Sequence, residues 1–139
     1  MEIEIFTIAD FACDYGTGKL SVIGTFDHIF SQNFPTVHPA CALAARIRLA
    51  NSEAGSHNLE LIFRGPDNRE FIERIKSQMN FQVNPAADYA TLNLVMNLNN
   101  IKFEKPGKYA IELYFDGEFR SGLHLNLIQG LPQGMPSAA

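Results

Sequence analysis

The sequence predicts an all-β protein, built as a single antiparallel β-sandwich of about seven to nine strands. Apolar and polar residues alternate with a period of two in nearly every segment, whereas an apolar period of 3.6 residues is almost absent. The chain has 139 residues, 46% of them hydrophobic, which is enough for one self-sufficient core. We expect the sandwich to span residues 1–128, and the glycine- and proline-rich residues 129–139 to form a flexible tail.

The first half of the chain divides into four predicted strands. The first runs from Ile3 to Cys13 and is followed by a turn at residues 14–19. The second covers residues 20–31, the third residues 40–50 and the fourth residues 57–64, after which residues 65–68 form a turn. In the first strand the alternation points one set of side chains inward, namely Ile3, Ile5, Ala9, Phe11 and Cys13.

Residues 69–84 allow two interpretations. Asp67 followed by Glu70 imitates a helix capping box, and a short helical stripe of apolar residues comes after it. Strand alternation covers more of the segment, with Phe71, Ile75, Met79, Phe81 and Val83 on one parity, so we predict one long or bent strand. Another strand follows over residues 88–103. Its inward residues are Ala90, Leu92, Leu94, Met96 and Leu98, and its outward residues include Thr91, Asn93, Asn97 and Asn99.

The last two strands form a hairpin whose turn is decided by parity. The apolar sets are Tyr109, Ile111, Leu113 and Phe115, then Phe119, Leu123, Leu125 and Leu127. A two-residue loop at residues 116–117 would set Leu113 opposite Arg120 and spoil the common apolar face. We therefore predict a three-residue loop with a bulge at Gly117, which pairs Leu113 with Phe119 and Glu112 with Arg120.

The approach to this hairpin has the pattern of a tyrosine corner. Gly107 precedes Tyr109 by two residues, and Ile111 follows where antibody domains place a cysteine. The chain contains no tryptophan, so the Cys-Trp-Cys core of antibody domains is missing. These features predict an immunoglobulin-like sandwich without the disulfide.

Three segments of the N-terminal half resemble a known family. They are Ala12-Cys13-Asp14-Tyr15, then Gly18-Lys19-Leu20-Ser21-Val22-Ile23-Gly24-Thr25-Phe26, then Phe34-Pro35. The pattern is similar to that of a family of small bacterial all-β proteins of unknown function with an immunoglobulin-like sandwich. The resemblance covers most of residues 3–128. It supports the fold and implies no reaction, cofactor or catalytic residue.

Charge and hydropathy argue against several classes of function. With 11 basic and 15 acidic residues the net charge is −4, which disfavours nucleic-acid binding through bulk electrostatics. No apolar run approaches the roughly 18 residues that a membrane-spanning helix needs. The first residues, Met1 to Ile5, carry acids where a secretory signal would carry bases. We therefore expect a cytoplasmic protein with neither membrane nor nucleic-acid partners.

Few residues suggest chemistry. Cys13 and Cys41 lack metal-type spacing and are expected to be free, buried thiols. Residues 16–19 (Gly-Thr-Gly-Lys) are better explained as a hairpin turn than as a phosphate-binding loop. The asparagines among residues 93–100 either solvate an outward face or offer an uncharged surface to a sugar or a peptide backbone. One acid-histidine group, Asp10, Asp14, Asp27 and His28, could serve as a metal or general-base site if it converges.

These observations favour a non-enzymatic binding or assembly module that acts through a sheet face or edge, without a cofactor or metal. The partner would be another protein or a second copy, which leaves homo-oligomerisation open. We expect the binding surface on the outward face of the last hairpin, beside Glu112 and the gap at Gly122, which we place opposite Ala110. Its residues are Tyr114, Arg120, His124 and Asn126. The alternatives are a metal-assisted or hydrolytic enzyme and a structural subunit of a larger particle.

Overall fold

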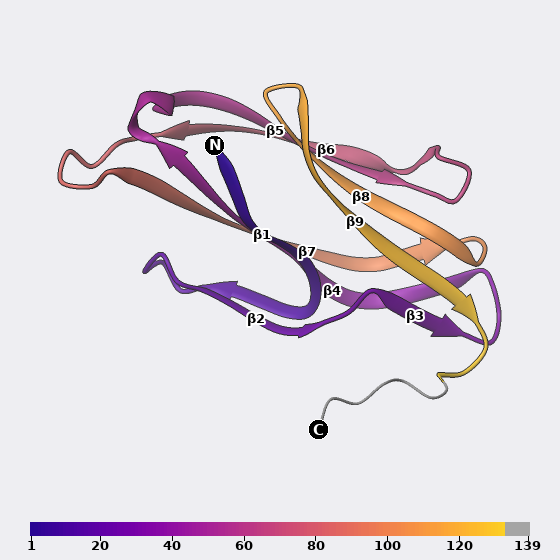
Figure 1. Cartoon of the computed structure of the whole chain (residues 1–139). Helices are drawn as coiled ribbons and strands as arrows, with labels where there is room; N and C mark the ends of the chain where they lie inside the picture. The colour runs from indigo at the N-terminus through magenta and orange to yellow at the C-terminus, as the bar shows by residue number, and fades with distance from the viewer. Residues whose placement is uncertain (133–139) are drawn as a thin grey trace.

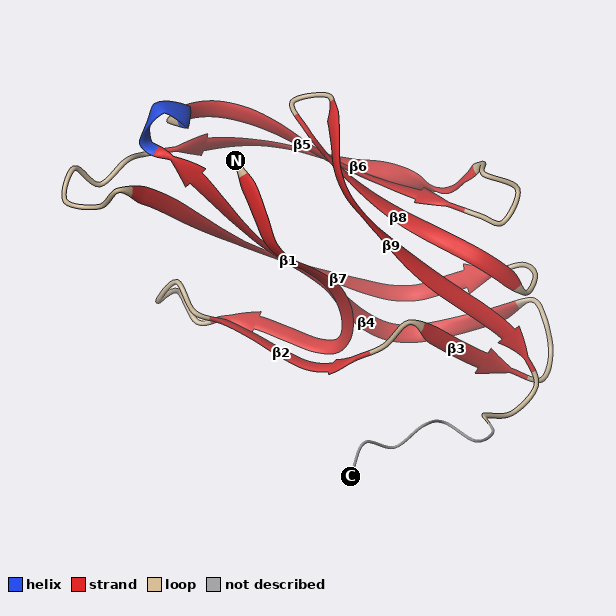
Figure 2. Cartoon of the chain, viewed as in Figure 1, coloured by secondary structure: helices blue, strands red, loops and turns tan. Residues whose placement is uncertain are grey.

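The structure, a computed structural model, describes residues 1–132 and is almost entirely β-strand (Figures 1 and 2). The only helical element in this range is the 3-10 turn Asn51–Glu53. The strands are β1 (Glu2–Asp14), β2 (Leu20–Thr25), β3 (His28–Ser31), β4 (Thr36–Ala50), β5 (Gly55–Arg64), β6 (Glu70–Phe81), β7 (Tyr89–Phe103), β8 (Gly107–Phe115) and β9 (Glu118–Gln129). The predicted tail begins at the end of β9, and its residues 133–139 lie outside the described part. No helix among residues 1–132 is both long and apolar enough to span a membrane.

Two sheets pack face to face, which confirms the predicted immunoglobulin-like β-sandwich. One sheet has the order β2-β1-β4-β7, and the other has the order β3-β9-β8-β5-β6. All pairs are antiparallel except β3 with β9, which run parallel. The predicted single strand over residues 20–31 is wrong, because this segment is divided into β2 in one sheet and β3 in the other. After Thr25 the chain crosses to the second sheet, where the carbonyl of Asp27 accepts the backbone N–H of Asn126 at 2.8 Å.

Alternation predicts the core correctly in β4, β5 and β8, which are paired on both sides. The largest fully buried side chains include Leu43 and Ile47 of β4, Phe63 of β5 and Leu113 of β8. Within residues 69–84 the structure has the strand β6 over residues 70–81 rather than a helix, and the β5–β6 pairing has register shifts near Phe63. The inward set predicted for residues 88–103 is confirmed, because the pairing of β7 with β4 places the even-numbered residues 92–98 on the inner face.

The inward set predicted for β1 is correct only in part. Ile3 packs against the core and Ala9 is buried, but Ile5 is exposed. A register shift between Ile3 and Ile5 moves the inner face from odd to even positions, so that Ile8 is buried. Phe11 is consequently 51% exposed, and Cys13 is half-buried rather than buried. A β-bulge of this kind adds one residue to a strand and reverses the parity of the residues after it.

The β1–β2 hairpin forms a partial third layer. In Figure 1 the end of β1 bends away and runs with β2 below β4 and β7. Arg46 of β4 reaches the hairpin by donating to the carbonyl of Gly18 at 3.1 Å. A small apolar cluster joins the layers, made of Ala12, Leu20, Val22, Ala42, Ala44 and Val95. Gly16 and Gly18 have positive φ values of 79° and 77°, as a tight turn requires.

The β8–β9 hairpin differs from the predicted register. Asp116 and Gly117 form a two-residue turn with φ values of 49° and 80°, and Phe115 pairs with Glu118. The parity conflict that argued against this turn is resolved by a bulge at Arg120, between the pairs formed by Phe119 and Ser121. The bulge lies in the strand rather than in the loop, and the predicted bulge at Gly117 is wrong.

The tyrosine corner is confirmed. The hydroxyl of Tyr109 donates to the carbonyl of Lys105 at 2.7 Å, and the side chain is 3% exposed. Its ring packs edge-on against Phe71 and Phe103, with centroids 5.0 Å away in both cases. Ile111 is buried at the position of the antibody cysteine. This corner fixes the start of β8 against the connection from β7.

Candidate functional site

The outward face of the last hairpin is held by contacts within the chain. The new register sets Glu112 opposite Gly122 instead of Arg120, and Ala110 opposite His124. The carboxylate of Glu112 binds Arg64 at 2.6 Å, while Arg120 pairs with Glu118 on its own strand at 2.9 Å.

The remaining residues of this face, like Glu112 and Arg120, make separate contacts and do not come together. Tyr114 lies on the Glu112 side, with its hydroxyl 3.5 Å from that carboxylate. Asn126 is engaged in the β3–β9 pairing, and His124 lines a separate shallow pocket between Ile8 and Phe26. The structure therefore places the four predicted residues along one hairpin without joining them in a pocket.

The sequence analysis assigned two exposed aromatic side chains to the core, because a bulge separates each of them from the rest of its strand's inward set. Phe119 is 55% exposed, and its ring meets Tyr114 edge-on with centroids 5.7 Å apart. Phe11 lies opposite Ile23, which is 62% exposed, on the outer side of the β1–β2 hairpin. Exposed apolar pairs of this kind are candidate contact points for a partner.

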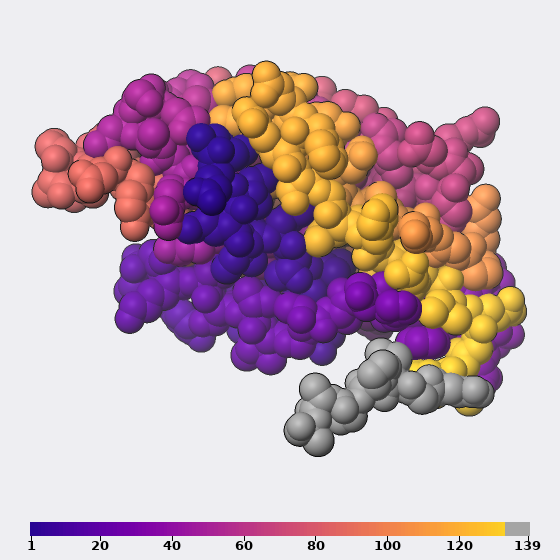
Figure 3. All heavy atoms as spheres, in the orientation of Figure 1, coloured from indigo at the N-terminus to yellow at the C-terminus, as the bar shows by residue number. Residues whose placement is uncertain are grey.

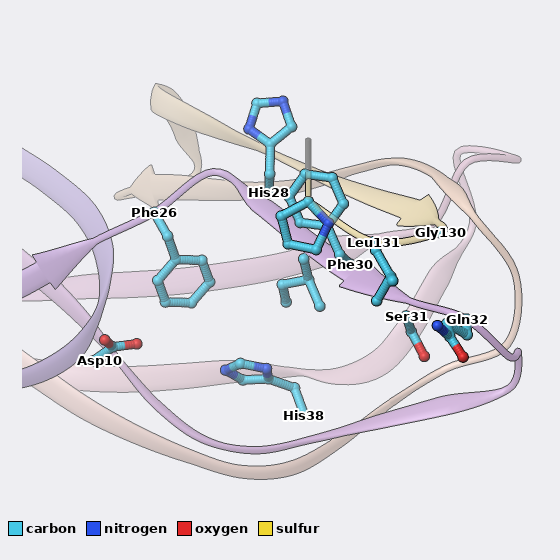
Figure 4. A pocket seen from close by; sticks show the side chains of 11 residues that line it. Asp10, Phe26, His28, Phe30, Ser31, Gln32, His38, Gly130 and Leu131 are labelled. Atoms are coloured by element: carbon cyan, nitrogen blue, oxygen red, sulfur yellow. The ribbon is translucent and has the colours of Figure 1, made fainter. Parts of the chain in front are cut away.

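The residues of the metal or general-base alternative lie apart. Asp14 is at the tip of the β1–β2 hairpin, where its carboxylate accepts the N–H of Gly16 at 2.9 Å. His28 is hydrogen-bonded through Nδ1 to its neighbour Asp27. In Figure 4 the His28 ring lies above β3, while Asp10 lies below it. Residues 1–132 contain no group of three or more His, Cys, Asp or Glu side chains that could hold a metal ion.

An open pocket of about 430 Å³ separates β3 from β1 and β4 (Figure 4). Phe26, Phe30, His38 and Asp10 line it. The His38 ring packs against Phe26 with centroids 5.6 Å apart, and its Nε2 atom is buried without a hydrogen-bond partner among residues 1–132. The pocket is mostly apolar, and it holds a single acidic side chain.

A charged cluster joins β5 to the turn between β8 and β9. Nδ1 of His57 binds the Asp116 carboxylate at 2.6 Å, and Nε2 faces the carbonyl of Glu53 at 2.5 Å. Both ring nitrogens thus face acceptors, which only the imidazolium can satisfy, and these two hydrogen bonds raise the pKa of His57. The pKa of Asp116 is lowered by the N–H of Asn58 and by His57. The cluster fixes the turn and is a structural feature.

The four edge strands of the two sheets differ in how well they are protected. An unpaired strand edge invites pairing with another chain, and proteins guard it with short strands, charges or proline. Strands β2 and β3 are short, and β6 carries Glu70, Glu73, Arg74 and Lys76. The β6 charges are tied into a network, because Arg74 binds Glu70 at 2.8 Å and Glu60 at 3.3 Å.

Strand β7 has none of these protections. It is 15 residues long and, among residues 1–132, pairs only with β4, so its other side carries backbone groups without a partner strand in this range. Between Tyr89 and Ile101 it contains no charged residue and no proline. A groove of about 390 Å³ opens beside it, lined by Phe71 and Ile72 of β6 and by Leu98 and its neighbours on β7. The unpaired side of β7 and this groove form the candidate surface, which we call the β7 edge.

On the opposite side of the sandwich the two sheets are in direct contact. There β1 and β9 touch across the two sheets, and Figure 3 shows the indigo start of β1 beside the yellow-orange hairpin of β8 and β9. The inner side chains next to the β7 edge are only half-buried although they pack against the core, namely Leu92, Met96 and Leu98 of β7 and Phe71, Ile75 and Met79 of β6. The core is thus less covered on this side.

Comparison with known proteins gives a family. The profile of a family of unknown function (DUF6941) matches residues 4–128. The chain belongs to this family. This confirms the resemblance of the sequence to a small all-β family of unknown function. Curated proteins give no match.

One solved structure is similar in fold to this family member. It is the alkylpurine DNA glycosylase AlkC of Pseudomonas fluorescens, bound to DNA containing an abasic site analog. The similarity covers 91% of the chain, with a TM-score of 0.49 and 7% sequence identity. The chain spans 30% of the length of that protein, and at this level the similarity carries no argument about function.

Proposed function

We propose that the protein is a non-catalytic binding or assembly module that accepts an additional β-strand on the β7 edge. The observation that supports this most directly is the contrast between β7 and the other edge strands. Among residues 1–132, only β7 combines length, an unpaired side and a long uncharged stretch. In strand addition the main chain supplies affinity, and pockets for alternate side chains supply specificity.

The chemistry of the edge defines the partner strand. Backbone N–H and C=O groups of β7 are strong donors and acceptors that an incoming strand would satisfy. On the outer side Asn97 and Asn99 are exposed and offer uncharged amides, while on the inner side Leu98 borders the apolar groove. The partner is therefore an extended strand with alternating polar and apolar residues and little charge.

A peptide-display selection tests this function. Random peptides long enough to span β7 are selected on the immobilised chain and on the variant Asn97→Lys/Asn99→Lys, in which two lysines guard the edge. The control variant, Gln78→Lys/Asn80→Lys, adds the same charge with the same spacing to exposed positions of β6. We expect peptides of alternating pattern that bind the wild type and the control but not the edge variant. Equal enrichment on all three chains would contradict the proposal, and so would a lack of enrichment on any of them while the immobilised chain is monomeric.

The outward hairpin face is a second candidate surface for the same kind of function. Its support is the contact of the exposed Phe119 with the half-buried Tyr114, since aromatic residues dominate interface hot spots. Peptides that survive the edge variant but are lost on Tyr114→Ala/Phe119→Ala would assign binding to this face.

A further inference from the structure

We infer that the strand that pairs with β7 is β7 of a second copy of the chain, which gives a two-fold symmetric dimer. This inference rests on the proposed function, because it names the partner of the same edge. Two antiparallel copies of one strand form an isologous contact. If residue i of one copy meets residue j of the other, residue j of the first copy also meets residue i of the second.

The sequence of β7 is self-complementary about Val95. Residues 92–98 read Leu-Asn-Leu-Val-Met-Asn-Leu, a pattern that is almost the same in both directions. If Val95 of one copy faces Val95 of the other, every side chain meets one of its own kind. The pairs created on either side are Leu94 with Met96, Asn93 with Asn97, Leu92 with Leu98 and Thr91 with Asn99.

Both faces of this paired strand are chemically consistent. Pairing with β4 puts the even-numbered residues on the core side, so the leucine and methionine pairs would extend the apolar core from one copy to the other. The asparagine pairs lie on the outer side, where each amide both donates and accepts a hydrogen bond. Cross-strand pairs of these kinds stabilise a sheet, whereas like charges placed directly opposite destabilise it.

Charge also explains why self-pairing suits β7. A strand that pairs with its own copy brings its charges together, and β7 has none between Tyr89 and Ile101. The nearest cation on the outer face is Arg46 of β4, which donates to Oδ1 of Asn93 at 2.9 Å. In the dimer a lysine at position 97 would lie opposite Asn93 and close to Arg46 of the other copy. The substitution Asn97→Lys therefore introduces repulsion at both symmetry-related positions.

Cysteine cross-linking tests both the dimer and its register. In a Cys13→Ser background, where Cys41 is buried, the single variants Asn93→Cys and Asn97→Cys are prepared separately and oxidised mildly. Neither should form a covalent dimer alone, because each new cysteine faces an asparagine in its partner. A mixture of the two should form one, because cysteines 93 and 97 are then directly opposite, within the roughly 4.5–5.5 Å between Cβ atoms of facing residues.

Light scattering gives the mass without cross-linking. We expect the wild type and the β6 control Gln78→Lys/Asn80→Lys to be dimers, and Asn97→Lys/Asn99→Lys to be a folded monomer with an unchanged circular dichroism spectrum. A wild type that stays monomeric up to about 1 mM would overturn the inference. So would cross-linking of either cysteine variant alone with an efficiency equal to that of the mixture. A monomer that still selects peptides through the β7 edge would refute the dimer but support the proposed function. A monomer that selects no peptides would refute both the dimer and the proposed function.

Discussion

Removal of the Tyr109 hydroxyl measures how much the tyrosine corner stabilises the sandwich. In Tyr109→Phe the ring keeps its edge-on contacts with Phe71 and Phe103, and only the 2.7 Å hydrogen bond to the carbonyl of Lys105 is lost. Burial raises the pKa of Tyr109, so the hydroxyl remains a donor at neutral pH. Lys105 is exposed, so water can reach the carbonyl that the variant leaves without its partner.

The free-energy change follows from these contacts. A hydrogen bond of this kind contributes about 1 kcal/mol net. For a domain of this size that corresponds to a fall of about 4 °C in Tm. Tyr109→Ala removes the ring as well, and the cost of a cavity in the core is about 3–5 kcal/mol.

Urea denaturation of both variants distinguishes the two contributions. Tyr114→Phe is the matched control, because its hydroxyl lies 3.5 Å from Glu112 near the surface, and its loss should change stability by less than about 0.5 kcal/mol. If Tyr109→Phe unfolds at the wild-type urea concentration, the corner hydrogen bond contributes nothing. If it costs as much as Tyr109→Ala, the hydroxyl does more than form one hydrogen bond. Either result would refute the reasoning.

Three further predictions concern charge, thiols and register. Because the pKa of His57 is raised, its contribution to stability is complete below about pH 6.5 and is lost as the pH rises through the folded-state pKa. Because the pKa of Asp116 is lowered, its contribution to stability is complete above about pH 4 and is lost as the pH falls through the folded-state pKa of Asp116. His57→Gln should therefore weaken the alkaline decline of stability in urea titrations at several pH values, and an unchanged decline would assign it to other groups. Burial raises the pKa of Cys41 to about 11, so a disulfide-exchange reagent at pH 8 should modify Cys13 at least about tenfold faster, and equal rates would contradict the packing around Cys41. Phe119→Ala should cost less than about 1 kcal/mol by denaturation because the side chain is 55% exposed, whereas a loss above about 3 kcal/mol would return it to the core.

Features that depend on local pattern could be predicted from the sequence. The alternation in β4 and β7 assigns their inner faces correctly, because both strands lie against one core over many consecutive pairs. The tyrosine corner depends on a hydroxyl and a carbonyl only four residues apart, Tyr109 and Lys105. Both features require no knowledge of how distant parts of the chain meet.

Bulges account for the errors within strands. The shift between Ile3 and Ile5 and the extra residue at Arg120 each reverse the parity of the later residues in the strand. The alternating sequence looks the same with or without the extra residue, and packing against another sheet decides between them. For this reason the alternation assigns Phe11, which follows its bulge, and Phe119, which precedes its own, to the core, although both lie at the surface.

The candidate site could not be predicted from the sequence analysis, because its location depends on the order of the strands in the sheet. The asparagines of residues 93–100 and the lack of charge around them are visible in the sequence, as is their suitability for a peptide backbone. Whether such a strand lies inside a sheet or at its edge depends on which strands the chain places beside it. The order β2-β1-β4-β7 shows that this uncharged strand lies at the edge of its sheet, where its backbone is accessible.

The path of the chain among residues 1–132 explains why β7 keeps an unpaired edge. After β6 the chain returns through residues 82–88 directly into β7 and places no strand beyond it, while β1 and β2 extend the same sheet on the far side of β4. On that far side β1 meets β9 and closes the gap between the sheets. A strand added next to β7 would close the other side in the same way, over the groove lined by Phe71 and Leu98. Charge introduced on the outer side of β7 should therefore change what the protein binds while the fold, which is held by the inner side, persists.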